Sequence, residues 1–247
     1  MLRYFILFGG LICGFALVPA AGQSWLPVQQ THERPAVQPL SRPAEPTVIR
    51  HEKNATAFFV DDAGHMLTAR HAADDCARIV VLKEGRAVAA HLVALSPRFD
   101  IALIKVPKTL GLSAVFPRSV TASVNDMVFA AAYDTLPGMM VRGGTLANAT
   151  VVSSFGGSEA GYLVIDSNVT FGASGAPVLD SRGLVEGVIS RRTMVNRVLT
   201  VGAAEAKAFL VGNGVHVEED DRPQIAGGSS RANRAASISA RVTCLQN

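Results

Sequence analysis

The chain has 247 residues, and 49% of them are hydrophobic, so it can bury one substantial core or two small ones. Its formal net charge of +3 is slight and its basic residues are scattered, which argues against a nucleic-acid-binding protein. No Cys/His cluster has metal-site spacing and no Gly-rich nucleotide-binding pattern occurs, so we expect neither a metal nor a cofactor.

Residues 1–21 have the pattern of a signal peptide. Arg3 gives a positive start, residues 5–18 form an apolar run, and the small residues at 18–20 suit cleavage. We therefore expect an exported protein, periplasmic or secreted, that has no membrane contact after cleavage. An uncleaved signal anchor is the alternative, because residues 4–31 carry no charge and approach the length that spans a membrane.

Residues 22–50 are rich in proline and glutamine. Proline removes backbone donors and favours extended, unpaired chain. We interpret this stretch as a linker or as an arm that lies across the following domain.

Residues 51–115 read as a first group of strands. The runs are short, apolar or alternating, and separated by turn residues. His71 opens a short helical turn directly after the second run. The predicted strands are 55–60, 65–69, 77–83, 88–95 and 101–106.

After a crossover, residues 120–202 read as a second group of strands. A helix is predicted over 203–211, because its composition is helical and Gly212 follows as a cap. Residues 213–247 read as a weakly ordered tail unless Cys244 ties it down. The predicted strands of this group are 127–132, 138–146, 149–155, 161–165, 177–179, 184–190 and 197–201.

Three polar residues stand beside these strands in a suggestive order. Ser174 lies among small residues in a turn that can present a hydroxyl and free backbone N–H groups. His71 follows an apolar run and Asp100 precedes one. Each alone fits an ordinary turn or surface residue, but His, Asp, Ser is a known chain order for a base, its orienting acid and a nucleophile.

The segments around these residues resemble those of trypsin-like serine proteases. Thr-Ala-Arg-His-Ala, Asp-Ile-Ala-Leu-Ile and Gly-Ala-Ser-Gly-Ala-Pro-Val are similar to three blocks of that family. The likeness runs from about residue 55 to 211 and is closest to the HtrA-type and glutamyl-endopeptidase-type bacterial branches. In full-length HtrA-type relatives a PDZ domain often follows the protease domain, and residues 213–247 are too few for one.

The resemblance implies an all-β fold of two six-stranded antiparallel barrels with a short C-terminal helix, spanning residues 51–212. It implies a serine endopeptidase that cleaves polypeptides through an acyl-enzyme. Ser174 would be the nucleophile, His71 the base and Asp100 the orienting acid, and Gly172 and Ser174 would supply the oxyanion donors. Ala176 departs from the Gly that many relatives have. The alternative is an inactive protease-like double barrel that serves as a binding module.

The specificity of such an enzyme is left open by the sequence. By resemblance, Asn168 lies at the base of the primary pocket, so strict cleavage after Lys or Arg is not expected. Val169, Thr170 and the strand of Ser190 suggest a modest pocket that suits small or medium apolar side chains, as in HtrA-type enzymes. Arg191 and Arg192, which follow Ser190, would instead favour acidic groups. Two solvated arginines on an edge strand are the third interpretation.

Cys76 and Cys244 remain once Cys13 is removed with the signal peptide. An even pair of cysteines in an exported protein is a disulfide candidate. Such a bond would hold the tail beside His71. Two unpaired thiols are the alternative.

Overall fold

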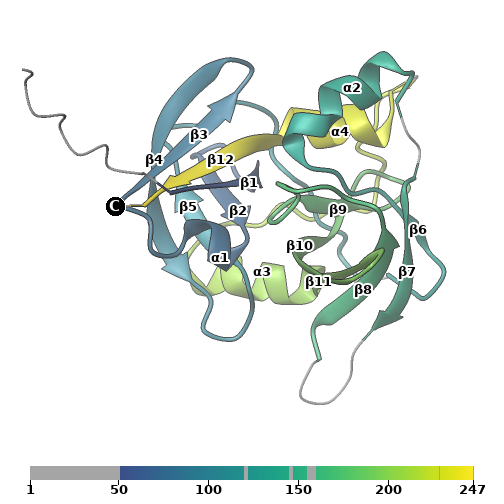
Figure 1. The fold of residues 1–247 in the computed structure, drawn as a ribbon. Helices are drawn as coiled ribbons and strands as arrows, with labels where there is room; N and C mark the ends of the chain where they lie inside the picture. The colour runs from purple at the N-terminus through teal and green to yellow at the C-terminus, as the bar shows by residue number, and fades with distance from the viewer. Residues whose placement is uncertain (1–50, 120–121, 145–146, 155–159, 228, 247) are drawn as a thin grey trace, which may run out of the picture. The chain divides into compact units, whose positions relative to one another are not determined.

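The computed structural model describes residues 51–119, 122–144, 147–154, 160–227 and 229–246. The predicted signal peptide and the whole of the Pro-rich arm lie outside these residues. The described part is built mainly of strands in two antiparallel sheets, with a few short helices. It therefore has the two-barrel all-β architecture that the resemblance implied (Figure 1).

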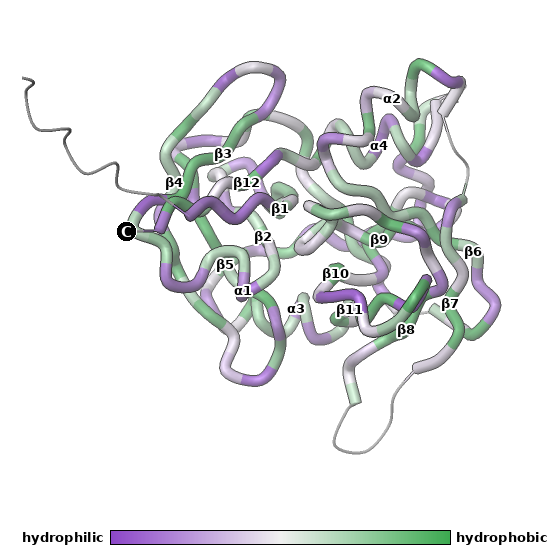
Figure 2. Tube along the Cα trace, in the orientation of Figure 1, coloured by the Kyte–Doolittle hydropathy of each residue, from purple (hydrophilic) through white to green (hydrophobic). Residues whose placement is uncertain are grey.

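Six antiparallel strands form a closed first barrel in the order β1-β12-β3-β4-β5-β2. Alternate side chains point into it, so Phe59, Ile104 and Val242 are fully buried together. Figure 2 shows hydrophobic segments running through its strands. The strands are β1 (Glu52–Phe59), β2 (His65–Thr68), β3 (Arg78–Lys83), β4 (Arg86–Leu95), β5 (Ala102–Lys105) and β12 (Ser239–Leu245).

The sixth strand of this barrel, β12, comes from the C-terminal segment. It pairs with both β1 and β3, and the yellow strand accordingly lies among the blue strands in Figure 1. Residues 239–245 of the expected tail, which contain Cys244, thus complete the first barrel. The strand was not predicted from the sequence because its inward positions include small residues and its outward positions include Arg241 and Thr243. This composition is also typical of a loop, so the alternation of buried and exposed positions is weak.

The second sheet has six strands in the order β6-β7-β8-β11-β10-β9. Phe129, just after β6, exchanges two backbone hydrogen bonds of 2.8 Å with Leu179 in β9, which brings the two ends of the sheet together into a nearly closed barrel. The strands are β6 (Met127–Val128), β7 (Ala149–Ser154), β8 (Tyr162–Ser167), β9 (Pro177–Leu179), β10 (Val185–Met194) and β11 (Arg197–Gly202).

The strand predicted over 138–146 is wrong in its described part, residues 138–144. A short 3₁₀-helix, η1 (Tyr133–Thr135), runs there into helix α2 (Leu136–Val141). Pro137 at the start of α2 has the fixed φ of a first helical turn and needs no N–H partner. The apolar run that follows was mistaken for a strand because periodicity does not separate a short apolar helix from a short strand.

Three further helices are present: α1 (Arg70–Ala73) lies within the first barrel, whereas α3 (Ala203–Gly212) and α4 (Arg231–Ile238) lie between the second barrel and β12. The predicted helix over 203–211 corresponds to α3. Helix α4 begins with a capping box, in which Ser230 and Asn233 satisfy each other's backbone N–H groups. It ends at the ammonium of Lys83, which donates to the carbonyls of Ala236 (2.6 Å) and Ser239 (2.9 Å).

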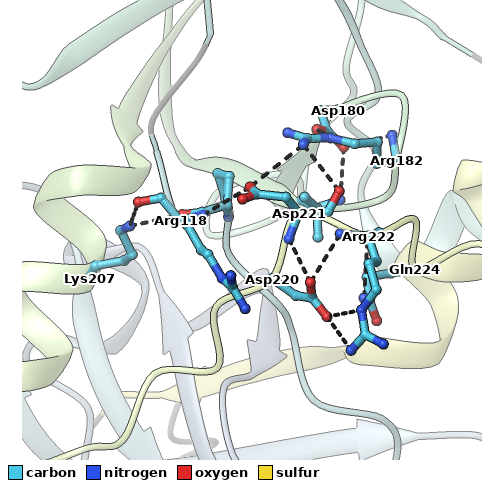
Figure 3. A network of polar contacts seen from close by, with 10 residues as sticks. Arg118, Asp180, Arg182, Lys207, Asp220, Asp221, Arg222 and Gln224 are labelled. Atoms are coloured by element: carbon cyan, nitrogen blue, oxygen red, sulfur yellow. Dashed lines mark hydrogen bonds and ion pairs between the residues drawn. The ribbon is translucent and has the colours of Figure 1, made fainter.

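The chain between α3 and α4 is fastened by a polar network (Figure 3). The side chain of Arg182 contacts the carboxylate of Asp180 (2.7 Å) and lies 3.7 Å from that of Asp221. Arg222 binds Asp220 in the same way. Lys207 of α3 donates both to the carbonyl of Pro117 and to the carboxylate of Glu219, so this segment and the crossover between the barrels are held together. These contacts direct the chain back to the first barrel.

One apolar cluster contains residues of both barrels, including Phe58, Leu67, Phe129, Leu179 and Val188. Because these side chains are fully buried, β1 and β2 of the first barrel and β9 and β10 of the second are held in fixed positions. In the described part of the chain, no helix has both the length and the apolar character needed to cross a membrane.

Candidate active site

The turn between β8 and β9 carries Ser174. Gly172 and Gly175 on either side of it adopt left-handed backbone conformations (φ +84° and +79°), which residues with a Cβ rarely adopt. Ala176 is accommodated without crowding the hydroxyl, because its methyl group is fully buried in the core of the second barrel. The small residues of this turn are therefore required by its backbone shape.

His71 lies in α1, directly after β2, and its ring is about half exposed (51%). Nδ1 lies 2.8 Å from Oδ2 of Asp100, and Nε2 lies 3.1 Å from Oγ of Ser174. Since an ionised carboxylate can only accept, Nδ1 carries the hydrogen when the ring is neutral, and Nε2 is left to accept from the hydroxyl. The structure thus brings these three residues within hydrogen-bonding distance.

Asp100 precedes β5 and has a side chain that is 20% exposed. Burial alone would raise the pKa of Asp100. Hydrogen bonds from the His71 ring, the Ser190 hydroxyl (2.7 Å) and the His71 backbone N–H (3.0 Å) outweigh burial and hold this pKa below its ordinary value. The carboxylate is therefore ionised near neutral pH and can fix the orientation of the imidazole.

Two backbone N–H groups near the hydroxyl have no hydrogen-bond partner among the described residues. They belong to Gly172 and Ser174, whereas the neighbouring Ala173 and Gly175 N–H groups donate to Thr170 and Ile189. Unpaired N–H groups beside a nucleophile are the donors that an oxyanion requires.

Thr56 in β1 is a residue of this site that the sequence did not reveal. Its hydroxyl donates to the carbonyl of Gly172, and its own carbonyl accepts from the hydroxyl of Thr68 (2.8 Å). Thr68 belongs to the Thr-Ala-x-His block, so that block has a second role besides carrying His71. The first barrel in this way holds the turn of the second.

A cavity of about 470 Å³ opens beside Ser174. Asn168, Arg191 and Arg192 line it, as expected from the sequence, and so do the apolar side chains of Val169 and Ile189. Ser190, expected in the same pocket, is instead buried (1% exposed) with its hydroxyl on Asp100. Ser190 therefore belongs to the hydrogen-bonding environment of Asp100.

A second hollow of about 500 Å³ is lined by His71. Its lining includes Asp100, Arg98, Tyr162 and Arg191, so Arg191 borders both cavities. A larger cavity of about 670 Å³, lined by Cys76 and His91, contains none of the three polar residues. Among the described residues, no cluster of three His, Cys, Asp or Glu side chains could hold a metal ion.

Cys76 and Cys244 form a disulfide with their Cα atoms 5.3 Å apart. Cys76 lies shortly after α1, and Cys244 lies in β12. The bond links the chain that follows His71 to the strand that completes the first barrel.

Comparison with known proteins gives this site a context. A family model described as the trypsin-like peptidase domain matches residues 55–188. An uncharacterized protein of Sinorhizobium fredii, y4bJ, is 29% identical over 231 residues, which cover 85% of this chain and 36% of that protein. A Bartonella henselae protein named probable periplasmic serine endoprotease DegP-like is 32% identical over 140 residues, covering 54% of this chain and 27% of the relative.

The chain thus spans about a third or less of the length of these relatives. Among solved structures, a serine-to-alanine mutant of Rv3671c from M. tuberculosis H37Rv in its inactive form is similar in fold, with a TM-score of 0.52 at 20% identity. That match covers 66% of this chain and 85% of the other.

Proposed function

The chain belongs to the trypsin-like peptidase family, and from this premise we propose that it is a serine endopeptidase with Ser174 as nucleophile, His71 as general base and acid, and Asp100 as orienting carboxylate. The observation that carries the proposal is the distance of 3.1 Å between Nε2 of His71 and Oγ of Ser174, with Nδ1 held by Asp100.

The first half of the reaction follows from this arrangement. Nε2 takes the proton of the Ser174 hydroxyl as Oγ attacks the carbonyl carbon of the peptide bond. The imidazolium that forms is stabilised by ionised Asp100. His71 then gives the proton to the leaving amine as the C–N bond breaks, and an acyl-enzyme on Ser174 remains. In the second half, His71 takes a proton from a water molecule whose oxygen attacks the acyl carbon, and returns it to Oγ of Ser174 as the ester bond breaks.

The negative charge that develops on the carbonyl oxygen needs preorganised donors. The partnerless N–H groups of Gly172 and Ser174 supply them in this proposal. The cavity lined by Asn168, Arg191 and Arg192 would receive the substrate side chain that precedes the cleaved bond.

We also propose that the substrates are polypeptides met outside the cytoplasm. A relative of this chain is named a periplasmic endoprotease, and residues 1–21 have the pattern of a signal peptide. Fractionation of cells that express the full chain tests this, and recovery from the cytoplasm alone would contradict it.

The activity is tested with a fluorophosphonate probe, which labels a serine only when a base activates it. We expect wild-type protein to be labelled and to degrade unfolded casein. Ser174→Ala should be unlabelled, and His71→Ala should lower turnover by ~10⁴-fold or more. A folded wild-type protein that neither reacts nor cleaves would make the double barrel a binding module instead.

A further inference from the structure

The cavity beside Ser174 has positively charged but no negatively charged lining residues. Its inner surface is apolar and includes Val169, Ile189 and Val198, while Arg191 and Arg192 supply two guanidinium groups. A volume of about 470 Å³ accommodates an amino-acid side chain of any class. Since size does not discriminate, the charge of the lining residues determines which class of side chain the cavity binds best.

Arg192 is positioned by a contact across this cavity. Its Nη2 donates to the carbonyl oxygen of Val169, so the guanidinium is attached to β10 at one end and to the chain before Ser174 at the other. A guanidinium has five N–H donors. The other donors of Arg192 have no partner among the described residues and remain for a ligand.

Neither Arg191 nor Arg192 forms an ion pair with a carboxylate within the described part of the chain. This differs from the other arginines whose ion pairs the structure contains: Arg70, Arg182, Arg197, Arg222 and Arg241. An unpaired cation that lines a cavity favours an anionic ligand, because a charge-assisted hydrogen bond is about twice as strong as a neutral one.

The adjoining hollow extends this positive field. Arg98 and Arg191 line it, and its one acidic residue, Asp100, is already occupied by His71 and Ser190. Arg70 also lines it, paired with Asp74. Cavities with walls of one sign concentrate ligands of the opposite charge.

The edge of β10 can hold a peptide across both cavities. Beyond Val188, β10 pairs with β11 on one side and with no strand on the other among the described residues. An extended peptide can add to such an edge through main-chain hydrogen bonds, and its side chains then reach the flanking pockets.

We propose that the substrate is an acidic peptide with Glu or Asp immediately before the cleaved bond, and that Arg192 binds this carboxylate with support from Arg191. This inference rests on the proposed peptidase activity. An apolar side chain fits the cavity less well, because it would remove water from the Arg192 guanidinium without offering an acceptor. The structure thus favours the acidic interpretation of the two that the sequence left open.

The test uses peptides that differ only at the residue before the cleaved bond, which is Glu, Gln, Val or Lys. Gln has nearly the shape of Glu without the charge. We expect wild-type kcat/KM to be on the order of tenfold to a hundredfold higher for Glu than for Gln. Arg192→Gln should bring the two values within about twofold, chiefly by slowing the Glu peptide, and Arg192→Glu should favour the Lys peptide.

Arg182→Gln is the matched control, because Arg182 lies in the network of Figure 3 and lines neither cavity. It should leave the Glu to Gln ratio unchanged. Equal cleavage of the Glu and Gln peptides, faster cleavage of the Val peptide, or an unchanged ratio in Arg192→Gln would overturn the inference. Fluorophosphonate labelling of Ser174 in the same samples separates the outcomes. A labelled enzyme without acidic preference defeats this inference alone, and an unlabelled, inactive protein defeats the proposed function.

Discussion

The hydroxyl of Thr56 in the first barrel donates a 2.8 Å hydrogen bond to the carbonyl of Gly172 in the second. The same oxygen accepts from the backbone N–H of Tyr133 (2.9 Å), and the backbone N–H of Thr56 donates to the carbonyl of Ser174 (2.9 Å). Thr56 is 1% exposed, so these bonds form away from water. One buried threonine therefore positions the turn that presents the Ser174 hydroxyl.

Replacing Thr56 by Val keeps its shape and removes its hydroxyl. The carbonyl of Gly172 then loses its donor, and the turn can move away from the geometry that an oxyanion needs. Loss of one oxyanion donor typically lowers kcat by ~10²–10³-fold. A misplaced donor should cost less, so we expect kcat to fall on the order of ten- to a hundredfold. KM should change by less than about threefold, because Thr56 lines neither cavity. Steady-state kinetics on a peptide substrate measure both.

The matched variant Thr56→Ser keeps the hydroxyl and should retain most of the wild-type kcat. Melting temperatures of both variants separate a local change from unfolding. Wild-type kcat in Thr56→Val would contradict the positioning role, and so would an equal loss in both variants.

Gly172 and Gly175 both have positive φ, but only Gly175 is crowded. A Cβ at Gly175 would lie 2.2 Å from the carbonyl oxygen of Thr56 and 2.5 Å from the Thr68 hydroxyl, whereas at Gly172 the nearest atom is 3.8 Å away. Gly172→Ala should therefore cost only the ~1–2 kcal/mol of a left-handed residue. Gly175→Ala should lower the free energy of unfolding by more than about 4 kcal/mol, because backbone must also shift.

Urea denaturation of the two alanine variants measures this difference. Each is the other's control, since the substitution and the backbone region are the same. Similar losses in both variants would show that the turn tolerates a methyl group at Gly175 and would contradict the close approach of the two barrels there.

The disulfide between Cys76 and Cys244 joins residues 168 positions apart. Cross-linking over so long a segment restricts the unfolded chain, and natural disulfides typically contribute ~2–4 kcal/mol. We expect Cys244→Ala to lower the free energy of unfolding by about this amount, as measured by urea denaturation without reductant.

Cys76→Ala should cost about the same, and the double variant should cost hardly more than either single one, because all three lack the same bond. Losses that add in the double variant would mean that the two side chains stabilise the fold separately rather than through a bond.

Much of the site could be predicted from sequence because its motifs lie at strand ends. His71 follows the run that forms β2, and Asp100 precedes the run that forms β5. The position of each polar residue at a strand end could therefore be predicted from the apolar run beside it. The distance between His71 and Ser174 could not be predicted, since it depends on how two barrels pack across 103 positions of sequence. Thr56 carried no signal at all, because its role lies in a contact 116 positions away.

Two elements were missed for a different physical reason. In α2 the residues Gly138 to Val141 are apolar enough to suit a strand, and tertiary packing decides whether they form a strand or a helix. In β12 the alternation is weak, and only pairing with β1 and β3 reveals which face is buried. Local patterns define an element poorly when its partners are far away in the chain.

The carboxylate of Asp100 should make stability depend on pH in acid. Burial raises its pKa, but the hydrogen bonds from His71 and Ser190 outweigh burial, so the pKa lies below its ordinary value of ~3.9. A carboxylate with a lower pKa in the folded than in the unfolded chain stabilises the fold above the unfolded value. That contribution disappears as the pH falls through the folded value. We expect the melting temperature of wild-type protein to fall more steeply than that of Asp100→Asn as the pH drops from about 6 to about 3.

Asp75→Asn is a suitable control for this comparison. Asp75 is exposed and has a φ of +59°, a conformation that Asn adopts as readily as Asp. The melting temperature of Asp75→Asn should therefore follow the wild-type curve as the pH falls. Both proteins keep all the other carboxylates, so the contributions of these groups cancel when the two curves are compared. If the Asp100→Asn curve also ran parallel to the wild-type curve, the hydrogen bonds to Asp100 would not favour its ionised form. The case for Asp100 as an ionised orienting group for His71 would then be lost.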